Sequence, residues 1–118
     1  MEVNKLVESM HEISKSKGWH DKERSPLEMH ALMHSEISEA TEEVRNNKPY
    51  VYQIEDGKII STNFKDNLKP EGEAIELVDC VIRIMDYFGY RKWDLEKLLT
   101  MKMQYNNTRS HRHGGKAY

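Results

Sequence analysis

The sequence has very few of the features that secreted and membrane proteins need. Its only cysteine, Cys80, cannot form a disulfide within the chain, and its position inside an apolar run suits a reducing compartment. No apolar run approaches the roughly 18 residues that a membrane-spanning helix requires, and no basic segment followed by an apolar core begins the chain. We therefore expect a cytoplasmic protein that has no membrane partner.

The chain also has little net charge and a small apolar fraction. Its 18 basic residues nearly balance 20 acidic ones, which argues against nucleic acid as a partner. Only 37% of the 118 residues are hydrophobic, so a core formed by one copy is marginal. We expect a single domain, residues 1–118, that completes its core as a homo-oligomer, a dimer or a tetramer. Residues from about 107 to 118 form a basic tail without acidic residues.

Apolar residues at helical spacing predict two helices in the first half of the chain. The first helix starts near Val3 and ends at Gly18. The second starts after Ser25, which is followed by a proline and, three residues further on, by a glutamate. We expect this second helix to run to about Asn46.

Two further helices are predicted in the second half. The third runs from about Glu71 to Phe88, with Gly89 as its C-terminal stop. The fourth follows Asp94, which can cap a helix, and continues to about Asn106.

Between the second and third helices, residues 50–63 are rich in β-branched and aromatic side chains around Asp56-Gly57. An Asp-Gly pair favours a type I′ hairpin turn, so we predict a small β-hairpin insertion there. The expected fold class is all-α, a four-helix bundle completed by oligomerisation with this hairpin inserted.

Carboxylates occur where an ordinary amphipathic helix would be apolar. A helical wheel puts Glu36 inside the apolar stripe of the second helix, with Glu39 one step away. The third helix is apolar over about half of its circumference, and we expect it to be buried on several sides. Its narrow polar strip consists of Glu76, Asp79, Arg83 and Asp86. Each i,i+3 pair, Glu36 with Glu39 and Glu76 with Asp79, lies on one side of its helix, so four acids can converge.

Converging carboxylates repel one another unless they are protonated or bridged by cations, and oxygen ligands suit Mg²⁺ or Mn²⁺. The alternative is an ordinary charged surface, on which Arg83, one turn after Asp79, neutralises the acidic strip as a salt bridge. His30 and His34 share a helix face, but no third ligand follows at a recognised spacing. We interpret both histidines as ordinary helix residues.

Four segments carry a family resemblance: S-E-I-S-E-A at 35–40, E-L-V-D-C-V-I-R at 76–83, K-M-Q-Y-N-N-T-R at 102–109 and H-G-G-K at 113–116. With them the chain resembles the MazG-like nucleotide pyrophosphohydrolases of the all-α NTP pyrophosphatase superfamily, in particular small stand-alone and phage-type members. The family pattern is E-x-x-E on one helix and E-x-x-D on a later helix. The interval between the two pairs is longer here than is usual in the family, and the surplus is the hairpin segment.

The resemblance implies hydrolysis of a nucleoside triphosphate, deoxy and non-standard nucleotides included, to a monophosphate and pyrophosphate with Mg²⁺ or Mn²⁺. It implies that the metal ligands are Glu36, Glu39, Glu76 and Asp79. It also implies that Glu39, or another carboxylate of this cluster, is the catalytic base that activates the attacking water. The implied substrate-binding residues are Trp19, Lys102, Asn106, Arg109, His113 and Lys116.

Other interpretations stay open at this point. Trp19, which would stack on the nucleobase, is by composition alone an ordinary core or staple residue. The chain as a whole could be a non-enzymatic helical interaction module whose basic tail binds nucleic acid. A carboxylate-bridged redox metal bundle is a weaker option, because the sequence lacks the Glu-x-x-His repeats of that class.

Overall fold

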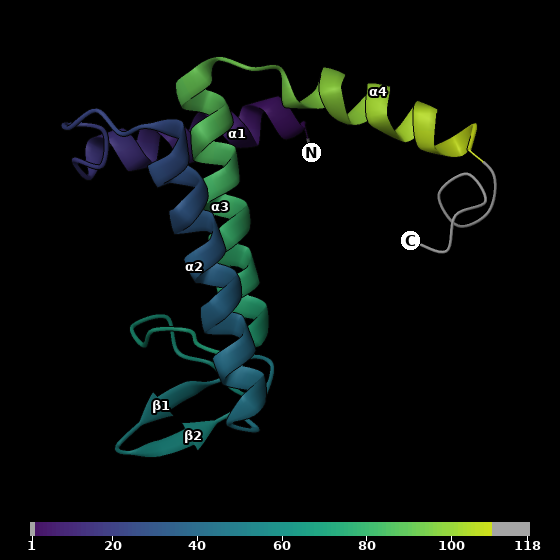
Figure 1. The fold of residues 1–118 in the computed structure, drawn as a ribbon. Coiled ribbons are helices and arrows are strands. Elements are labelled where there is room, and N and C mark those ends of the chain that lie inside the picture. The colour runs from purple at the N-terminus through teal and green to yellow at the C-terminus, as the bar shows by residue number, and fades with distance from the viewer. Residues whose placement is uncertain (1, 110–118) are drawn as a thin grey trace.

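The fold is given by a computed structural model, which describes residues 2–109. Four helices and one β-hairpin follow one another along the chain (Figure 1). Their bounds are Val3–Ser16 (α1), Pro26–Arg45 (α2), Gln53–Glu55 (β1), Lys58–Ile60 (β2), Glu73–Arg91 (α3) and Leu95–Asn107 (α4). The prediction of a mostly helical chain with a hairpin between the second and third helices is confirmed. Most of the predicted basic tail lies outside the described residues.

The predicted helix starts of α2 and α4 are confirmed by their capping hydrogen bonds. The Ser25 hydroxyl accepts a hydrogen bond from the backbone N–H of Glu28 over 3.1 Å, and Pro26 occupies the first helical position. The Asp94 carboxylate accepts one from the backbone N–H of Lys97 over 2.9 Å. In both cases a side-chain oxygen satisfies an N–H group that the helix itself leaves without a partner.

The first residue of α3 differs from the expectation because the hairpin uses the backbone of Glu71. The N–H and C=O groups of Glu71 and Tyr52 exchange hydrogen bonds of 2.8 and 2.9 Å, as in an antiparallel ladder. Gly72 follows with a φ of 119°, and a Cβ atom there would lie 2.4 Å from the carbonyl oxygen of Tyr50. The helix therefore begins at Glu73 and not at about Glu71.

The expected stop at Gly89 is also wrong, because α3 continues to Arg91 and ends at Lys92 in the left-handed conformation. Gly89 serves helix packing instead. A Cβ atom on Gly89 would lie 2.6 Å from the Cβ atom of His11 on α1. The absence of a side chain at this position therefore allows α1 to lie directly against α3.

The hairpin has the turn that its sequence predicts. Strands β1 and β2 pair antiparallel, and both turn residues have positive φ, 51° at Asp56 and 77° at Gly57, as a type I′ turn requires. Buried Gln53 fixes the loop that follows: its Nε2 donates to the carbonyl oxygens of Lys65 and Leu68, and its Oε1 accepts from the N–H of Lys65.

Helices α2 and α3 lie side by side and α1 packs against α3. Helix α4 projects away from α2 and α3 (Figure 1). The attachment of α4 is polar: Asn4 on α1 exchanges hydrogen bonds with Glu96 and donates another to Asp94. The radius of gyration is 17.5 Å, whereas a compact chain of this length would have about 13–14 Å. One copy therefore does not close the expected four-helix bundle.

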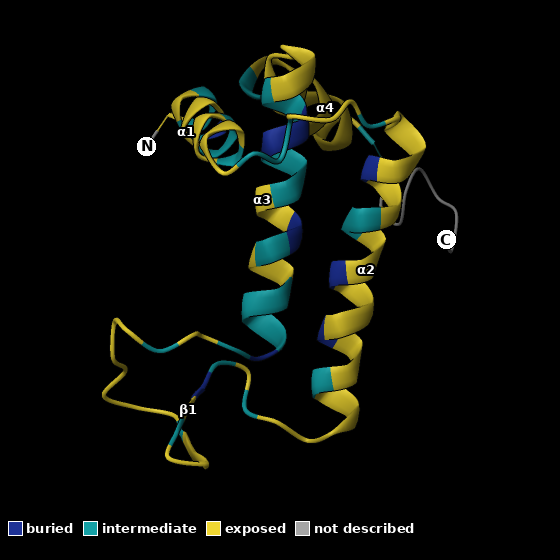
Figure 2. Cartoon of the chain, turned by 90° about the vertical axis from the view of Figure 1, so that its left-hand side faces the viewer, coloured by how far each residue is buried: buried dark blue, intermediate teal, exposed yellow. Residues whose placement is uncertain are grey.

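Burial within one copy is sparse (Figure 2). Within residues 2–109 the buried apolar side chains are Val7, Met29, Ala40, Tyr52, Cys80 and Tyr87. The expectation that α3 is buried on several sides is wrong for a single copy, because four of its apolar residues are 40–48% exposed: Leu77, Val78, Val81 and Ile82. Each described helix is too short or too polar to cross a lipid bilayer.

Candidate functional site

Three of the four predicted carboxylates meet between α2 and α3. One oxygen of Glu36 on α2 and one each of Glu76 and Asp79 on α3 lie within 4.8 Å of one another. One turn away, the Cys80 thiol on α3 donates to the carbonyl oxygen of Met33 on α2 over 3.5 Å. Glu36 is only 6% exposed, as expected from its place inside the apolar stripe of α2.

Arg83 is paired with Glu36 across the helix interface. Its Nε donates to Oε1 of Glu36 over 2.8 Å, and Glu36 has almost no contact with solvent that could replace this hydrogen bond. The alternative interpretation placed a salt bridge of Arg83 within the strip of α3, whereas the ion pair that forms connects α3 to α2. The Arg83 charge still acts on Asp79 at longer range, because it offsets part of the rise in the pKa of that carboxyl.

The crowding of these acids shifts their pKa values in opposite directions. Burial raises the pKa of Glu76, and contact with Glu39 and repulsion by Asp79 and Glu36 add to this, so that it reaches about 7. Burial and repulsion by Glu36 also raise the pKa of Asp79. Burial acts the same way on Glu36, but the hydrogen bond from Arg83 and contacts with neighbouring acids outweigh it and lower its pKa.

Glu39 borders this cluster and does not belong to the group of three converging oxygens. Its carboxylate acts on both Glu36 and Glu76, lowering the pKa of Glu36 and raising that of Glu76. It also lines an adjoining cavity of about 360 Å³ that Glu76 enters from the other helix. The Glu39 carboxylate therefore faces the cluster from the direction of the hairpin.

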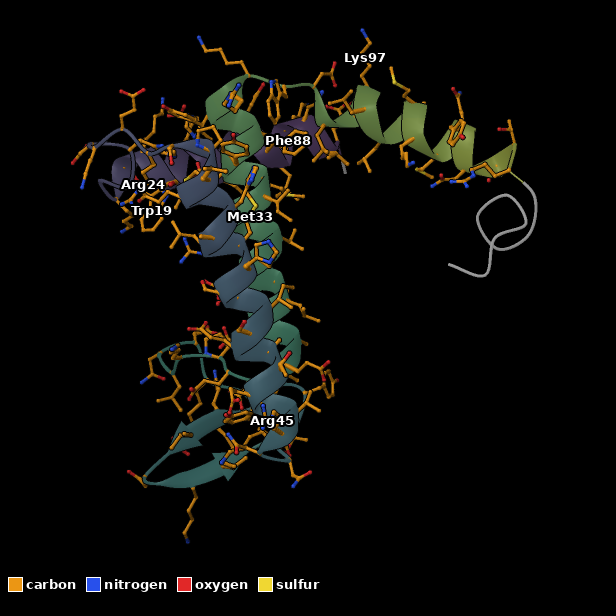
Figure 3. All side chains as sticks on the ribbon, in the orientation of Figure 1. Trp19, Arg24, Met33, Arg45, Phe88 and Lys97 are labelled. Atoms are coloured by element: carbon orange, nitrogen blue, oxygen red, sulfur yellow. The ribbon has the colours of Figure 1, made fainter. Side chains whose placement is uncertain are left out.

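A pocket of about 570 Å³ opens on the other side of the carboxylates. It is lined by residues of α1, α2, α3 and the loop after α1, among them Glu36, Asp79 and Trp19. The Trp19 ring lies 4.1 Å from the Arg24 guanidinium carbon and 5.0 Å from that of Arg83, measured to the ring centroid (Figure 3). Trp19 is thus part of a pocket wall that also carries positive charge.

The residues predicted on the fourth helix are not brought to this pocket within one copy. Lys102 and Asn106 are exposed on α4, and Lys102 lies against the ring of Tyr105 at 5.3 Å. Arg109 lies 5.5 Å from the centroid of the same ring. None of the described residues that line the pocket comes from α4. His113 and Lys116 lie outside the described residues.

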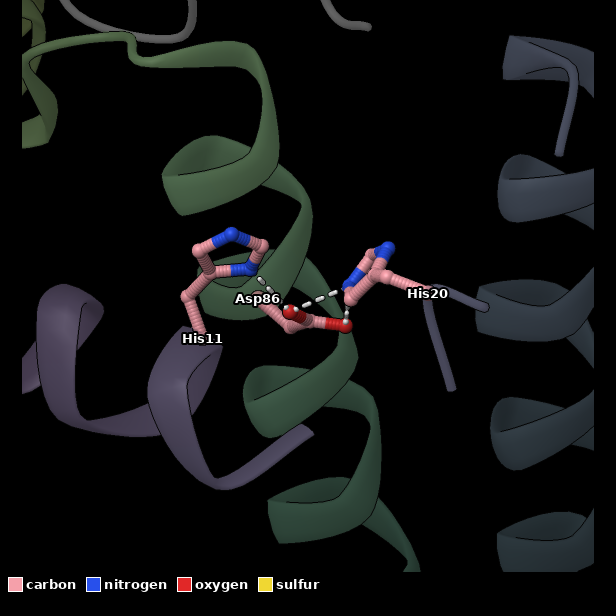
Figure 4. Close-up of side chains that lie close together, drawn as sticks. All are labelled: His11, His20 and Asp86. Atoms are coloured by element: carbon pink, nitrogen blue, oxygen red, sulfur yellow. Dashed lines mark hydrogen bonds and ion pairs between the residues drawn. The ribbon is translucent and has the colours of Figure 1, made fainter. Parts of the chain in front are cut away.

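A second group of ligand-type side chains was not expected from the sequence. His11 on α1, His20 in the following loop and Asp86 on α3 come together, each with one candidate ligand atom within 4.8 Å of the others (Figure 4). Asp86 was expected only as a member of the polar strip. Its position on a largely apolar helix indicates a buried partner, but the spacing of the histidines gives no sign of that partner. His30 and His34 belong to neither group found in residues 2–109.

The oxygen-only donor set of Glu36, Glu76 and Asp79 could hold a hard divalent cation, because the raised pKa values of Glu76 and Asp79 reflect negative charge that a bound cation would compensate. Comparison with protein-family models, curated proteins and solved structures finds no match to this chain.

Proposed function

We propose that this chain is a nucleoside triphosphate pyrophosphohydrolase, which converts a nucleoside triphosphate, deoxy or non-standard nucleotides included, to the monophosphate and pyrophosphate. The observation that carries the proposal is the juxtaposition of three converging carboxylate oxygens with a pocket that Trp19 and Arg83 line. Two of the sequence segments that resemble MazG-like enzymes, S-E-I-S-E-A at 35–40 and E-L-V-D-C-V-I-R at 76–83, contain these three carboxylates.

Glu36, Glu76 and Asp79 would hold Mg²⁺ or Mn²⁺, with Glu39 next to them. The bound ion would neutralise charge on the phosphate oxygens, which is the main requirement for cleaving a phosphoanhydride. Arg83 keeps Glu36 in its ionised form and in one orientation, because the guanidinium donates directly to its carboxylate.

The attacking water needs a carboxylate beside the cation that can orient it and accept its proton. Glu39 meets this condition, because it contacts Glu36 and Glu76 without joining the three converging oxygens. We assign it the task of orienting the water and accepting its proton. Glu76, with a pKa of about 7, is the alternative base within the cluster.

Trp19 would bind the nucleobase. Aromatic rings stack on any base, and the Trp19 ring lines the same pocket as two of the carboxylates. Arg24 and Arg83 lie beside this ring, where they pair with the carboxylates of Glu28 and Glu36, respectively.

A homo-oligomer would complete the site. Apolar residues along α3 and α4 are exposed in one copy, among them Val78 at 48%, Val81 at 47% and Met103 at 62%. A second copy of the chain would bury them. Because α4 does not contribute to the pocket of its own copy, Lys102, Asn106 and Arg109 would contact the phosphates or ribose bound by a neighbouring copy.

The test is product analysis with a panel of nucleoside triphosphates and Mg²⁺. We expect monophosphate and pyrophosphate in equal amounts, and loss of activity in Glu76→Ala. Glu73→Ala, on the first turn of the same helix but outside the cluster, is the matched control and should stay active. Release of orthophosphate, or full activity of Glu76→Ala, would refute the proposal.

A further inference from the structure

A second polar cluster lies near the opposite end of α3 from the hairpin. Asp86 is 4% exposed and is surrounded by donors (Figure 4). Nδ1 of His11 lies 2.8 Å from Oδ1 of Asp86, and Nε2 of His20 lies 2.9 Å from the same oxygen and 3.0 Å from Oδ2. The hydroxyl of Ser14 donates to Oδ2 over 2.9 Å.

The two imidazole rings are held in place by packing. The His20 ring stacks on Tyr90 at a centroid distance of 4.9 Å and meets the His11 ring edge to face at 4.8 Å. Both histidine side chains are largely buried, 16% exposed for His11 and 11% for His20. Gly89 contributes by allowing His11 to approach α3. The donor atoms are therefore preorganised by three separate segments of the chain.

Two imidazole nitrogens and a carboxylate form a donor set of a different kind from the oxygen-only cluster. Imidazole nitrogen is a preferred ligand of Zn²⁺, Cu²⁺, Fe²⁺ and Ni²⁺, whereas Mg²⁺ prefers oxygen. In a tetrahedral zinc site the ligand atoms are roughly 3.3 Å apart, since each bond is about 2.0–2.1 Å long. The nitrogen–oxygen distances of 2.8–3.0 Å are a few tenths of an ångström shorter, so a small outward movement would admit an ion.

We propose that His11, His20 and Asp86 form a second metal site that takes a late first-row divalent ion, with Zn²⁺ as its expected occupant. A carboxylate accepts hydrogen bonds, so without the ion both ring nitrogens donate to it. To bind the ion, each imidazole must present an unprotonated nitrogen and carry its proton on the other ring nitrogen, so that the ion would take the place of the two protons between nitrogen and oxygen. No oxidation or reduction is involved.

His11, His20 and Asp86 would supply three ligands, which leaves one coordination position of a four-coordinate ion open. Ser14 and Asp86 both line the pocket that also contains Glu36 and Asp79. The remaining position is therefore available to the Ser14 hydroxyl or to a water molecule from this pocket. The ion would also tie α1 and the loop after it to α3. Neither consequence depends on nucleotide hydrolysis.

The experiment is Zn²⁺ titration of the full chain, prepared without a polyhistidine tag, in the presence of excess Mg²⁺ to occupy the oxygen cluster. We expect one tightly bound Zn²⁺ per chain and a rise in the unfolding temperature, because the ion binds only the folded state. Titration with Co²⁺ should give the visible absorption of a tetrahedral site.

Two variants remove the ligands with different risks to folding. Asp86→Asn leaves a buried amide, which risks unfolding the chain. The main variant is therefore His20→Gln, in the loop after α1. Circular dichroism confirms that this variant keeps its helices. We expect His20→Gln to weaken Zn²⁺ binding at least roughly tenfold and to abolish the stabilisation. The controls are Glu36→Gln and a variant that replaces His30, His34, His111 and His113, and both should bind Zn²⁺ like the parent.

Two results would overturn the proposal. The first is that the parent binds no Zn²⁺, or loses all of its Zn²⁺ binding when His30, His34, His111 and His113 are replaced. The second is that a folded His20→Gln variant binds Zn²⁺ as tightly as the parent. In either case the cluster is a hydrogen-bonded contact between α1 and α3 only.

Discussion

Arg83 on α3 donates a hydrogen bond over 2.8 Å to Glu36 on α2, and this ion pair connects the two helices at the centre of the carboxylate cluster. The Glu36 side chain is 8% exposed and the Arg83 side chain 26%. A nearly buried carboxylate that loses its donor remains desolvated without compensation, so the pair matters more to stability than an exposed salt bridge does.

Replacing Arg83 should therefore destabilise the protein. We expect Arg83→Ala to lower the free energy of unfolding by about 1–3 kcal/mol, because the Glu36 carboxylate stays buried without its partner. Urea denaturation measures the change. The double variant Arg83→Ala/Glu36→Gln should recover part of the loss, since the amide carries no charge. Equal stability of Arg83→Ala and the double variant would show that the buried Glu36 carboxylate costs no stability when the Arg83 hydrogen bond is lost.

The stability of the metal-free protein should fall as the pH rises from about 4.5 to about 7, the range between the ordinary and the folded-state pKa of Glu76. A raised pKa means that the folded chain holds this proton more tightly than the unfolded chain. Protonation therefore favours folding, and this contribution is lost as the pH rises through the window. We expect a loss on the order of 1–2 kcal/mol after allowance for solvent screening.

Urea denaturation with a chelator at about pH 5 and about pH 7.5 measures this effect. The relevant quantity is the difference between the parent and Glu76→Gln, because other groups titrate in the same range. Saturating Mg²⁺ should restore stability at the higher pH, since a cation then compensates the charge of Glu76. If the stability of Glu76→Gln changes with pH as much as that of the parent, residues other than Glu76 cause the change.

Trp19→Ala should weaken binding of the nucleotide more than it slows the chemical step. Loss of base stacking costs about 1–3 kcal/mol, which corresponds to a rise in KM of roughly tenfold or more. Trp19→Phe keeps an aromatic face and should lie close to the parent. Steady-state kinetics with the best nucleotide of the panel separates KM from kcat. A fall in kcat alone would place Trp19 in the scaffold and not in the base pocket.

A shared site between copies can be tested by mixing two inactive variants. Lys102→Ala removes a cation of α4, and Glu36→Gln removes a carboxylate from the pocket. If the pocket of one copy uses α4 of another, each mixed dimer contains one intact site and one inactive site. An equal mixture of Lys102→Ala and Glu36→Gln should therefore recover roughly a quarter of the parent activity. Subunits must be exchanged by mild denaturation and refolding before the assay. No recovery, in a mixture shown to contain mixed dimers, would exclude a site shared in this way.

The sequence alone was sufficient to predict those features that depend on interactions between residues close together in the chain. The caps at Ser25 and Asp94 and the turn at Asp56-Gly57 are formed by hydrogen bonds and backbone angles within a few residues, so the pattern alone identifies them. The carboxylate pairs could be found because helical spacing places both members of a pair on one face.

The remaining features depend on contacts between distant segments. Gly89 looks like a helix stop, but it is a packing position because His11 lies against it. His11 is 75 residues away from its partner Asp86, and His20 is 66 away, so no local spacing reveals their meeting. The exposure of Val81 shows another limit: an apolar helix face predicts burial, but Val81 is 47% exposed within one copy.

The base of the hairpin joins both helices that carry the carboxylates. The backbone of Tyr52 bonds to Glu71, two residues before α3, and the Tyr52 hydroxyl donates to the Glu43 carboxylate on α2. The turn at Asp56-Gly57 is exposed and stands away from these bonds. A fluorophore attached at the turn would thus report on the position of the hairpin while leaving the carboxylates of Glu36, Glu76 and Asp79 untouched.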